Sequence, residues 1–116
     1  MTAPHTPRRG EIWLVGFDPA VGTEIRKTRP ALVVSNDIAN DRSPKVTVLP
    51  ITGTVRESPI VVVVQPDERN RLDRPSLVRV PDVSTFDRVR LKRRLGVLAP
   101  ETMREVSEKL RVHLGL

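Results

Sequence analysis

The run IVVVV at residues 60–64 limits the fold of this chain more than any other stretch. All five residues are β-branched, and such side chains pack well on a pleated sheet but lower helix propensity. The run has the length of a strand, and Ser58 and Pro59 directly before it are typical turn residues. The chain is therefore expected to contain a β-sheet in which this run is one strand.

Similar short segments recur along the rest of the sequence. Each is rich in β-branched, leucine or aromatic residues and lies close to proline, glycine or other turn residues. We predict further strands at residues 11–17, 29–35, 46–52, 76–80, 83–86 and 95–98. Pro50 lies within one of them. Because proline has no N–H to donate, we expect that strand at an edge of the sheet or with a bulge.

The connections between these segments are polar. Asn36 and Asp37 can cap a single helical turn that ends near Asp41, and another turn is expected at residues 87–91. Residues 65–75, QPDERNRLDRP, are charged, show no hydrophobic period and carry a proline near each end. We therefore expect them to form an exposed loop.

The last part of the chain has the period of a helix. Pro100 suits the first helical position, and Gly115 suits the end of a helix. Apolar residues lie between them at the spacing i, i+3, i+7 and i+11, namely Met103, Val106, Leu110 and Leu114. We predict an amphipathic helix at residues 100–113. Several short strands followed by one C-terminal helix predict a mainly β domain, as a small bent sheet or partly open barrel packed on the helix.

A length of 116 residues fits a single domain. We expect residues 1–8 to form a flexible arm and residues 9–116 to form the folded unit. The sequence has no Cys, which excludes disulfides and cysteine nucleophiles. It also has no stretch of about 20 apolar residues and no apolar signal-peptide core near its start, so we expect no membrane contact and a cytoplasmic location.

The net charge indicates the class of partner. The sequence has 20 Lys and Arg against 14 Asp and Glu, which gives a net charge of +6 and a pI near 11.0. This excess favours a polyanion such as a nucleic acid, because contacts to phosphates release counterions. A high arginine content can also reflect genome base composition. With Trp13, Phe17 and Phe86 as the only aromatic residues, a surface that stacks several bases is not expected.

No group of residues has the spacing of a metal or cofactor site. His5 and His113 lie in the expected arm and in the expected helix, far apart in the sequence. Asp37 and Asp41 are four residues apart, but without a third ligand we interpret them as cap and turn residues. The sequence has no phosphate-binding P-loop. We therefore predict no metal and no cofactor.

Cleavage of RNA needs neither a metal nor a cofactor, because the ribose 2′-OH is a nucleophile within the substrate. An enzyme must align it with the phosphorus, move two protons and stabilise the charge on the phosphate. Arg29 lies where a polar loop joins a strand at Pro30, and its guanidinium can bind a phosphate with two hydrogen bonds. Thr52 ends a strand before Gly53 and can donate its hydroxyl. By themselves, Arg29 also fits a solvated turn and Thr52 an ordinary strand position.

Five short motifs follow one another in the chain, RGEIW, DP, VGTE, RPALVVSND and PIT. In this order and spacing they resemble the MazF/PemK-like family of toxin endoribonucleases, and the resemblance extends from Arg9 to Leu116. It implies a compact, bent β-barrel of the CcdB and MazF type, related to SH3-like barrels. It also implies a homodimer with an RNA groove across its interface, metal-independent cleavage of single-stranded RNA at short motifs, and a cognate MazE-like antitoxin with an acidic tail in that groove.

The family's active-site residues can be carried over one at a time. Its catalytic arginine corresponds to Arg29, its catalytic threonine to Thr52, and an acidic active-site position to Glu24. The resemblance also implies RNA-binding positions in the loop before Arg29 and directly after Thr52. These positions are Gly22, Thr23, Lys27 and Gly53.

The chain departs from the family pattern at residues 82–84. Family members often have a Gln followed by a basic residue where this sequence has Asp82, Val83 and Ser84. We assign Asp82 and Ser84 to RNA binding. An Asp at this position accepts hydrogen bonds from amino groups of a base and repels phosphate. The family pattern therefore does not give the base preference of this chain.

The leading prediction is an endoribonuclease toxin that cuts mRNA and so inhibits translation and growth. A second reading is a gyrase-binding toxin of the CcdB type, which has no catalytic activity. Those toxins end in a helix with a tryptophan near the C-terminus, whereas this chain ends Leu114, Gly115, Leu116. A third reading is a basic barrel that binds nucleic acid without cleaving it.

Overall fold

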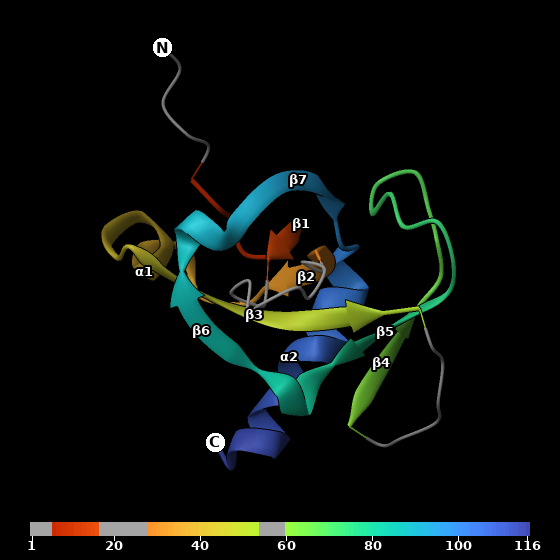
Figure 1. The fold of residues 1–116 in the computed structure, drawn as a ribbon. Coiled ribbons are helices and arrows are strands. Elements are labelled where there is room, and N and C mark those ends of the chain that lie inside the picture. The colour runs from red at the N-terminus through yellow and green to blue at the C-terminus, as the bar shows by residue number, and fades with distance from the viewer. Residues whose placement is uncertain (1–5, 17–27, 54–59) are drawn as a thin grey trace, which may run out of the picture.

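The strands of this protein form one antiparallel sheet (Figure 1). The structure, a computed structural model, describes residues 6–16, 28–53 and 60–116. The strands in these residues are β1 (Glu11–Gly16), β2 (Thr28–Val33), β3 (Lys45–Thr52), β4 (Val61–Val64), β5 (Ser76–Arg79), β6 (Ser84–Asp87) and β7 (Leu91–Val97). They lie in the order β4-β5-β3-β2-β1-β7, and β6 pairs with β3 beside this path.

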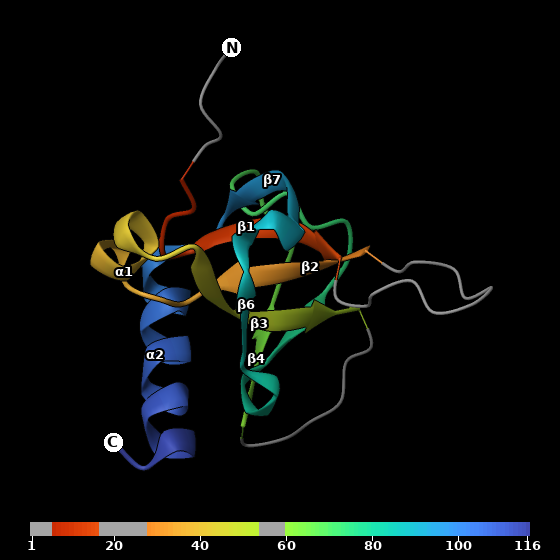
Figure 2. The same ribbon diagram turned by 60° about the vertical axis from the view of Figure 1, so that its left-hand side comes forward.

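Helix α2 (Pro100–Leu114) covers one face of the sheet, as the second view shows (Figure 2). Pro100 lies in its first turn. Gly115 ends it in the left-handed conformation, with a φ of 72°, which glycine adopts without steric cost. Val106 is fully buried in one core cluster with Ile12 and Leu32 of the sheet. The prediction of a mainly β domain with one C-terminal helix is confirmed.

A second core cluster lies on the opposite face of the sheet, which we call the distal face. Side chains alternate along a strand, so Leu32 faces α2 whereas Ala31 faces away from it. Val15, Ala31 and Val48 mark the distal face, and all three are fully buried. This face therefore has a close-packed base, which fixes the strand backbones that carry the neighbouring side chains.

The predicted elements correspond to observed ones. Each of the seven predicted strands is present, and the predicted turns are present as α1 (Asp37–Arg42) and the 3₁₀ helix η2 (Arg88–Arg90). A second 3₁₀ helix, η1 (Val80–Asp82), separates β5 from β6. β7 begins earlier than the predicted residues 95–98. The prediction missed its first half because that half is charged and polar, yet it pairs with β1. Within the described ranges no helix is long and apolar enough to cross a membrane.

The predicted edge position of the strand that contains Pro50 is wrong. β3 lies inside the sheet, with β2 on one side and both β5 and β6 on the other. On that second side, β6 pairs with β3 as far as Val48, and β5 pairs with it from Ile51 onwards. Pro50 falls at this change of partner. Its missing N–H is tolerated because neither β5 nor β6 pairs with β3 there.

The loop of residues 65–75 is built around a buried side chain, Asn70, which is 1% exposed. The amide oxygen of Asn70 accepts hydrogen bonds from the backbone N–H groups of Asp67 and Leu72, at 3.1 and 3.0 Å. Its amide nitrogen donates to the carbonyl of Gln65 at 2.9 Å. The loop lies at the surface as predicted, but its backbone is fixed by its own side chains.

Glu11 is a buried carboxylate that connects β1 with β7 and with the residues before β1. Its Oε2 accepts a hydrogen bond from Nε of Arg94 at 2.6 Å. Its Oε1 accepts from the backbone N–H of Arg8 at 2.8 Å and from the indole N–H of Trp13 at 3.1 Å. Removal of the carboxylate would leave these donors without their acceptor.

We expect Glu11→Ala to destabilise the protein by about 3 kcal/mol, because one partner of a buried ion pair is lost and two further donors lose their acceptor. Glu11→Gln keeps a neutral acceptor for Arg8 and Trp13, so it should lose less stability than Glu11→Ala. Urea denaturation followed by circular dichroism measures both variants. An unchanged midpoint for Glu11→Ala would show that these contacts do not stabilise the fold.

The residues before β1 lie against α1. The guanidinium of Arg8 donates from Nη1 and Nη2 to Oδ1 of Asp41, each at 2.9 Å. The backbone N–H of Arg9 donates to Oδ1 of Asp37 at 2.8 Å. The arm expected at residues 1–8 includes Arg8 and also Pro7, which is buried. The last residues of that segment are therefore in contact with the domain.

The hydrogen bond from the Arg9 backbone, with help from Asn40 and the charges of Arg8 and Arg9, holds the pKa of Asp37 below its ordinary value of 3.8. Because the ionised form is favoured in the folded state, this group stabilises the protein above that value, and the contribution disappears as the pH falls through 3.8 and below.

We therefore expect Asp37→Asn to lower stability at pH 6 but not at pH 2. The loss should be less than about 1 kcal/mol, because the side chain is half-exposed and its charge is screened by solvent. Thermal unfolding at both pH values tests this, with Asp73→Asn as a control at a side chain that is 84% exposed. Equal losses at the two pH values would contradict the role of the Asp37 charge.

Candidate active site

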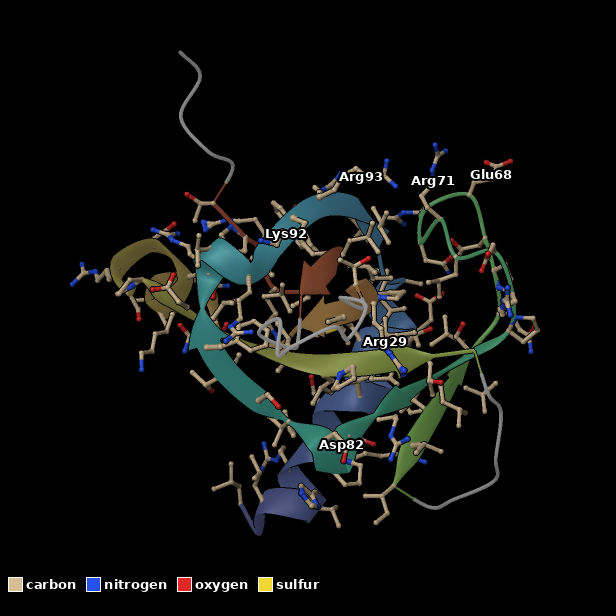
Figure 3. All side chains as sticks on the ribbon, viewed as in Figure 1. Arg29, Glu68, Arg71, Asp82, Lys92 and Arg93 are labelled. Atoms are coloured by element: carbon tan, nitrogen blue, oxygen red, sulfur yellow. The ribbon has the colours of Figure 1, made fainter. Side chains whose placement is uncertain are left out.

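Arg29, the second residue of β2, lies on the distal face. It pairs with Val15 of β1, and the alternation that turns Ala31 to this face also turns Arg29 there. The residue is exposed, and within the described ranges its side chain makes no hydrogen bond or ion pair (Figure 3). Its guanidinium is thus in a position to bind an anion from solution.

Thr52, the last residue of β3, lies on the same face. The register of β2 with β3 pairs Ala31 with Pro50. Extended by two residues, this register sets Arg29 opposite Thr52, and facing residues have Cβ atoms about 5 Å apart. On its other side Thr52 pairs with Leu77 of β5. The guanidinium of Arg29 and the hydroxyl of Thr52 therefore start from neighbouring positions.

Gly53 lies directly under the side chain of Arg74. A Cβ at Gly53 would lie 2.6 Å from Cδ of Arg74, so any larger residue would displace this arginine. The two residues border a small surface pocket of about 260 Å³ at this end of the sheet. Its walls are Pro30, Ile51, Gly53, Leu72, Asp73, Arg74 and Ser76.

Asp82 and Ser84 lie where the chain passes from β5 to β6. Oδ2 of Asp82 is 2.7 Å from Nε of Arg79, and the hydroxyl of Ser84 donates to the backbone carbonyl of Asp82 at 3.0 Å. Ser84 pairs with Val48 of β3, which puts it on the distal face. The carboxylate of Asp82 (Figure 3) thus already has a cationic partner within the protein.

Four predicted site residues, Gly22, Thr23, Glu24 and Lys27, lie outside the described residues. Of the others, Arg29, Thr52 and Ser84 share the distal face. Gly53 directly follows Thr52, and Asp82 is the last residue of η1, two residues before Ser84. The arrangement supplies a guanidinium and a hydroxyl at adjacent positions, and two such donors can bind the same anionic group.

Arg79 is absent from the predicted set although it belongs to the same face. Thr52 faces Leu77, and Arg79 follows two residues later on β5, so its side chain projects to the distal face as well. The sequence contains one signal, an exposed cation at the end of the run SLVR. It does not show that this strand lies beside the one that ends in Thr52.

No metal-ligand cluster of three His, Asp or Glu side chains is present in residues 6–16, 28–53 and 60–116. A larger hollow of about 600 Å³ elsewhere on the surface includes Trp13, Arg88, Leu91 and Lys92 in its walls. Of the predicted site residues that the structure describes, none lines it. The candidate site instead lies at the end of three neighbouring strands, β2, β3 and β5.

Comparison with known families gives one match over nearly the whole chain. The family described as the PemK-like, MazF-like toxins of type II toxin–antitoxin systems matches residues 8–114. The chain belongs to this family. The resemblance drawn from the five sequence motifs is thereby confirmed.

Relatives of this MazF-like chain include an enzyme and two solved structures. The chain is 34% identical over 110 residues to the endoribonuclease MazF of Staphylococcus saprophyticus, covering 94% of this chain and 92% of that protein. A mycobacterial endoribonuclease in complex with its cognate antitoxin superposes with a TM-score of 0.77 at 27% identity, covering 95% of this chain and 96% of that one. A MazE–MazF structure from Deinococcus radiodurans gives 0.83 at 25% identity, covering 97% and 98%.

Proposed function

We propose that this MazF-like toxin is a metal-independent endoribonuclease that cuts single-stranded mRNA at a short sequence motif and so stops translation and growth. Its similarity to the endoribonuclease MazF of S. saprophyticus over 94% of the chain supports the reaction class. The observation that supports the site is the register of β2 and β3, in which Ala31 pairs with Pro50. Continued by two residues, this register brings Arg29 opposite Thr52 on one face.

In the proposed reaction the 2′-oxygen attacks the adjacent phosphorus, and the bond from phosphorus to the 5′-oxygen breaks. The products are a 2′,3′-cyclic phosphate and a 5′-hydroxyl. Arg29 binds the phosphoryl oxygens, stabilises the charge of the transition state and donates a hydrogen bond to the leaving 5′-oxygen, which takes its proton from water, while Thr52 donates a hydrogen bond to a non-bridging oxygen. A guanidinium stays protonated in proteins, so Glu24 or an oriented water takes the proton from the 2′-OH.

Further contacts in the proposal come from the RNA-binding positions predicted in the sequence. Those in the loop before β2 are Gly22, Thr23 and Lys27, and those on the described surface are Gly53 and Ser84, together with Asp82 through its ion pair with Arg79. The net charge of +6 supports binding of a polyanion along this surface.

The proposal includes two protein partners and a location. The chain forms a homodimer, and a cognate, acidic MazE-like antitoxin binds it in the cytoplasm. A complex with a cognate antitoxin is known for the mycobacterial relative, and a MazE–MazF complex for the one from D. radiodurans. The excess of basic residues in this chain suits an acidic antitoxin segment.

One assay separates the three functions considered for this chain. Purified protein is incubated in EDTA with a long RNA that contains both paired and unpaired regions. Specific cuts in the unpaired regions support the endoribonuclease. RNA binding without cuts would favour a non-catalytic nucleic-acid-binding barrel. Neither binding nor cuts, together with inhibition of gyrase, would favour a CcdB-like toxin.

Sedimentation and salt titration test the partners. A monomer at micromolar concentration would contradict the homodimer. Affinity for the antitoxin should fall as salt rises, because added ions screen the attraction between a basic surface and an acidic segment. An affinity that stays the same when the salt concentration is raised about tenfold would argue against an electrostatic contribution.

A further inference from the structure

We propose that Arg79 is an RNA-positioning residue of this site and that Asp82 acts through Arg79 rather than by reading a base. The inference rests on the proposed function and adds a second guanidinium to it. The guanidinium of Arg79 binds the same RNA strand at the phosphate next to the one that is cleaved.

The position of Arg79 follows from the register of β3 with β5. Thr52 lies directly opposite Leu77, and Arg79 is two residues further along β5. It is therefore the diagonal neighbour of Thr52, about 7–8 Å away, a separation that long side chains can span. Arg29 lies on the β2 side of Thr52 and Arg79 on the β5 side. An RNA strand that crosses the end of β3 would pass both arginines.

The contact with Asp82 fixes how Arg79 can bind. Oδ2 of Asp82 is 2.7 Å from Nε, at the inner edge of the guanidinium. The two Nη groups carry four further N–H donors, and within the described residues no other acceptor binds them. About half of each side chain is exposed, 53% for Arg79 and 45% for Asp82. The pair thus presents the outer edge of a guanidinium, held from behind, to the surface.

The same contact changes the role of Asp82. A lone carboxylate beside an RNA strand repels phosphate and can accept only from base amino groups. Paired with Arg79 at 2.7 Å, the carboxylate has an opposite charge beside it, and one of its oxygens is occupied. Its chief effect is then to hold the arginine in place, because Asp82 follows Arg79 by one turn of 3₁₀ helix. We therefore assign the contact with RNA to Arg79.

The test compares variants by KM, kcat and the cleavage motif on a set of short RNAs. Arg79→Ala should raise KM about tenfold with little change in kcat, the range typical for one hydrogen bond to a charged group. Arg79→Lys keeps the charge but not the planar fork, so its KM should lie between those of wild type and Arg79→Ala. Arg79→Ala/Asp82→Asn should bind RNA better than Arg79→Ala, because the unpaired carboxylate is gone. In all of them the motif should be unchanged.

Arg104→Ala is the matched control, because Arg104 is exposed on α2, on the other side of the sheet. An unchanged KM for Arg79→Ala would overturn the inference. A changed base preference in Asp82→Asn would also overturn it, since Asp82 would then read a base directly. A loss of antitoxin affinity without a change in KM would assign Arg79 to the antitoxin instead.

Direct RNA binding, measured by fluorescence anisotropy on wild type and Arg79→Ala, separates this inference from the proposed function. If wild type binds RNA without cutting it and Arg79→Ala binds about tenfold more weakly, the endoribonuclease fails while the RNA contact of Arg79 stands. If wild type cuts RNA and both proteins bind equally, the endoribonuclease stands and the inference on Arg79 fails.

Discussion

Arg29→Ala is expected to slow RNA cleavage by roughly 10²- to 10³-fold, the typical loss for one preorganised donor that stabilises transition-state charge. The substitution removes the guanidinium that lies opposite Thr52 in the extended register of β2 and β3. Single-turnover cleavage of a short RNA measures the chemical step without product release. Thr52→Ala should show a smaller loss, because a neutral hydroxyl donates a weaker hydrogen bond than a cation.

The fold should be unaffected by Arg29→Ala. Within the described ranges the side chain makes no hydrogen bond or ion pair, and it is exposed. Its removal should change the free energy of unfolding by no more than about 0.5 kcal/mol. Cleavage at the wild-type rate by a folded Arg29→Ala protein would show that the site is assigned wrongly.

Gly96→Ala is expected to destabilise the protein strongly. Gly96 lies in β7 against the backbone of the loop at residues 65–75. A Cβ at this position would lie 2.2 Å from the carbonyl oxygen of Arg69 and 2.8 Å from the carbonyl of Asn70. The loop cannot easily move away, because Asn70 holds its backbone and the N–H of Val97 donates to the carbonyl of Arg69 at 2.9 Å.

Insertion of a methyl group into such a contact typically costs about 1–3 kcal/mol, and we expect the upper end of that range because the opposing atoms are backbone. Urea denaturation measures the loss. Gly16→Ala is the matched control, since among the described residues its Cβ would meet only the end of the Lys92 side chain, at 3.4 Å. If both variants unfold at the same urea concentration, the close approach of β7 to the loop does not limit this position.

The fold was largely predictable because its signals are local. The β-branched run of β4, the proline and glycine at the ends of the C-terminal helix, and the spacing of its apolar residues each act over a few residues. Pro50 was misplaced for the opposite reason. Its missing N–H is tolerated only because β6 ends and β5 begins beside it, and such a change of partner depends on residues that are distant in the sequence.

The site was predictable in part for the same reason. Arg29 and Thr52 could be named from motifs, but their position relative to each other depends on the register of two strands, which pairs Ala31 with Pro50. The ion pair of Arg79 with Asp82 was not predicted, although the residues are only three positions apart. A departure from the family pattern drew attention to Asp82 and Ser84 but not to Arg79. The 3₁₀ turn that brings the side chains of Arg79 and Asp82 together became visible only in the structure.

The central claim is that the 2′-OH of the substrate is the nucleophile at a metal-independent site, and one substitution in the RNA tests it. A short RNA containing a mapped cleavage site is compared, in EDTA, with the same RNA carrying a 2′-deoxy nucleotide on the 5′ side of the cut. We predict that wild-type protein cuts the first to a 2′,3′-cyclic phosphate and a 5′-hydroxyl, and that it binds but does not cut the second. Cleavage of both at the same rate would contradict the proposed mechanism.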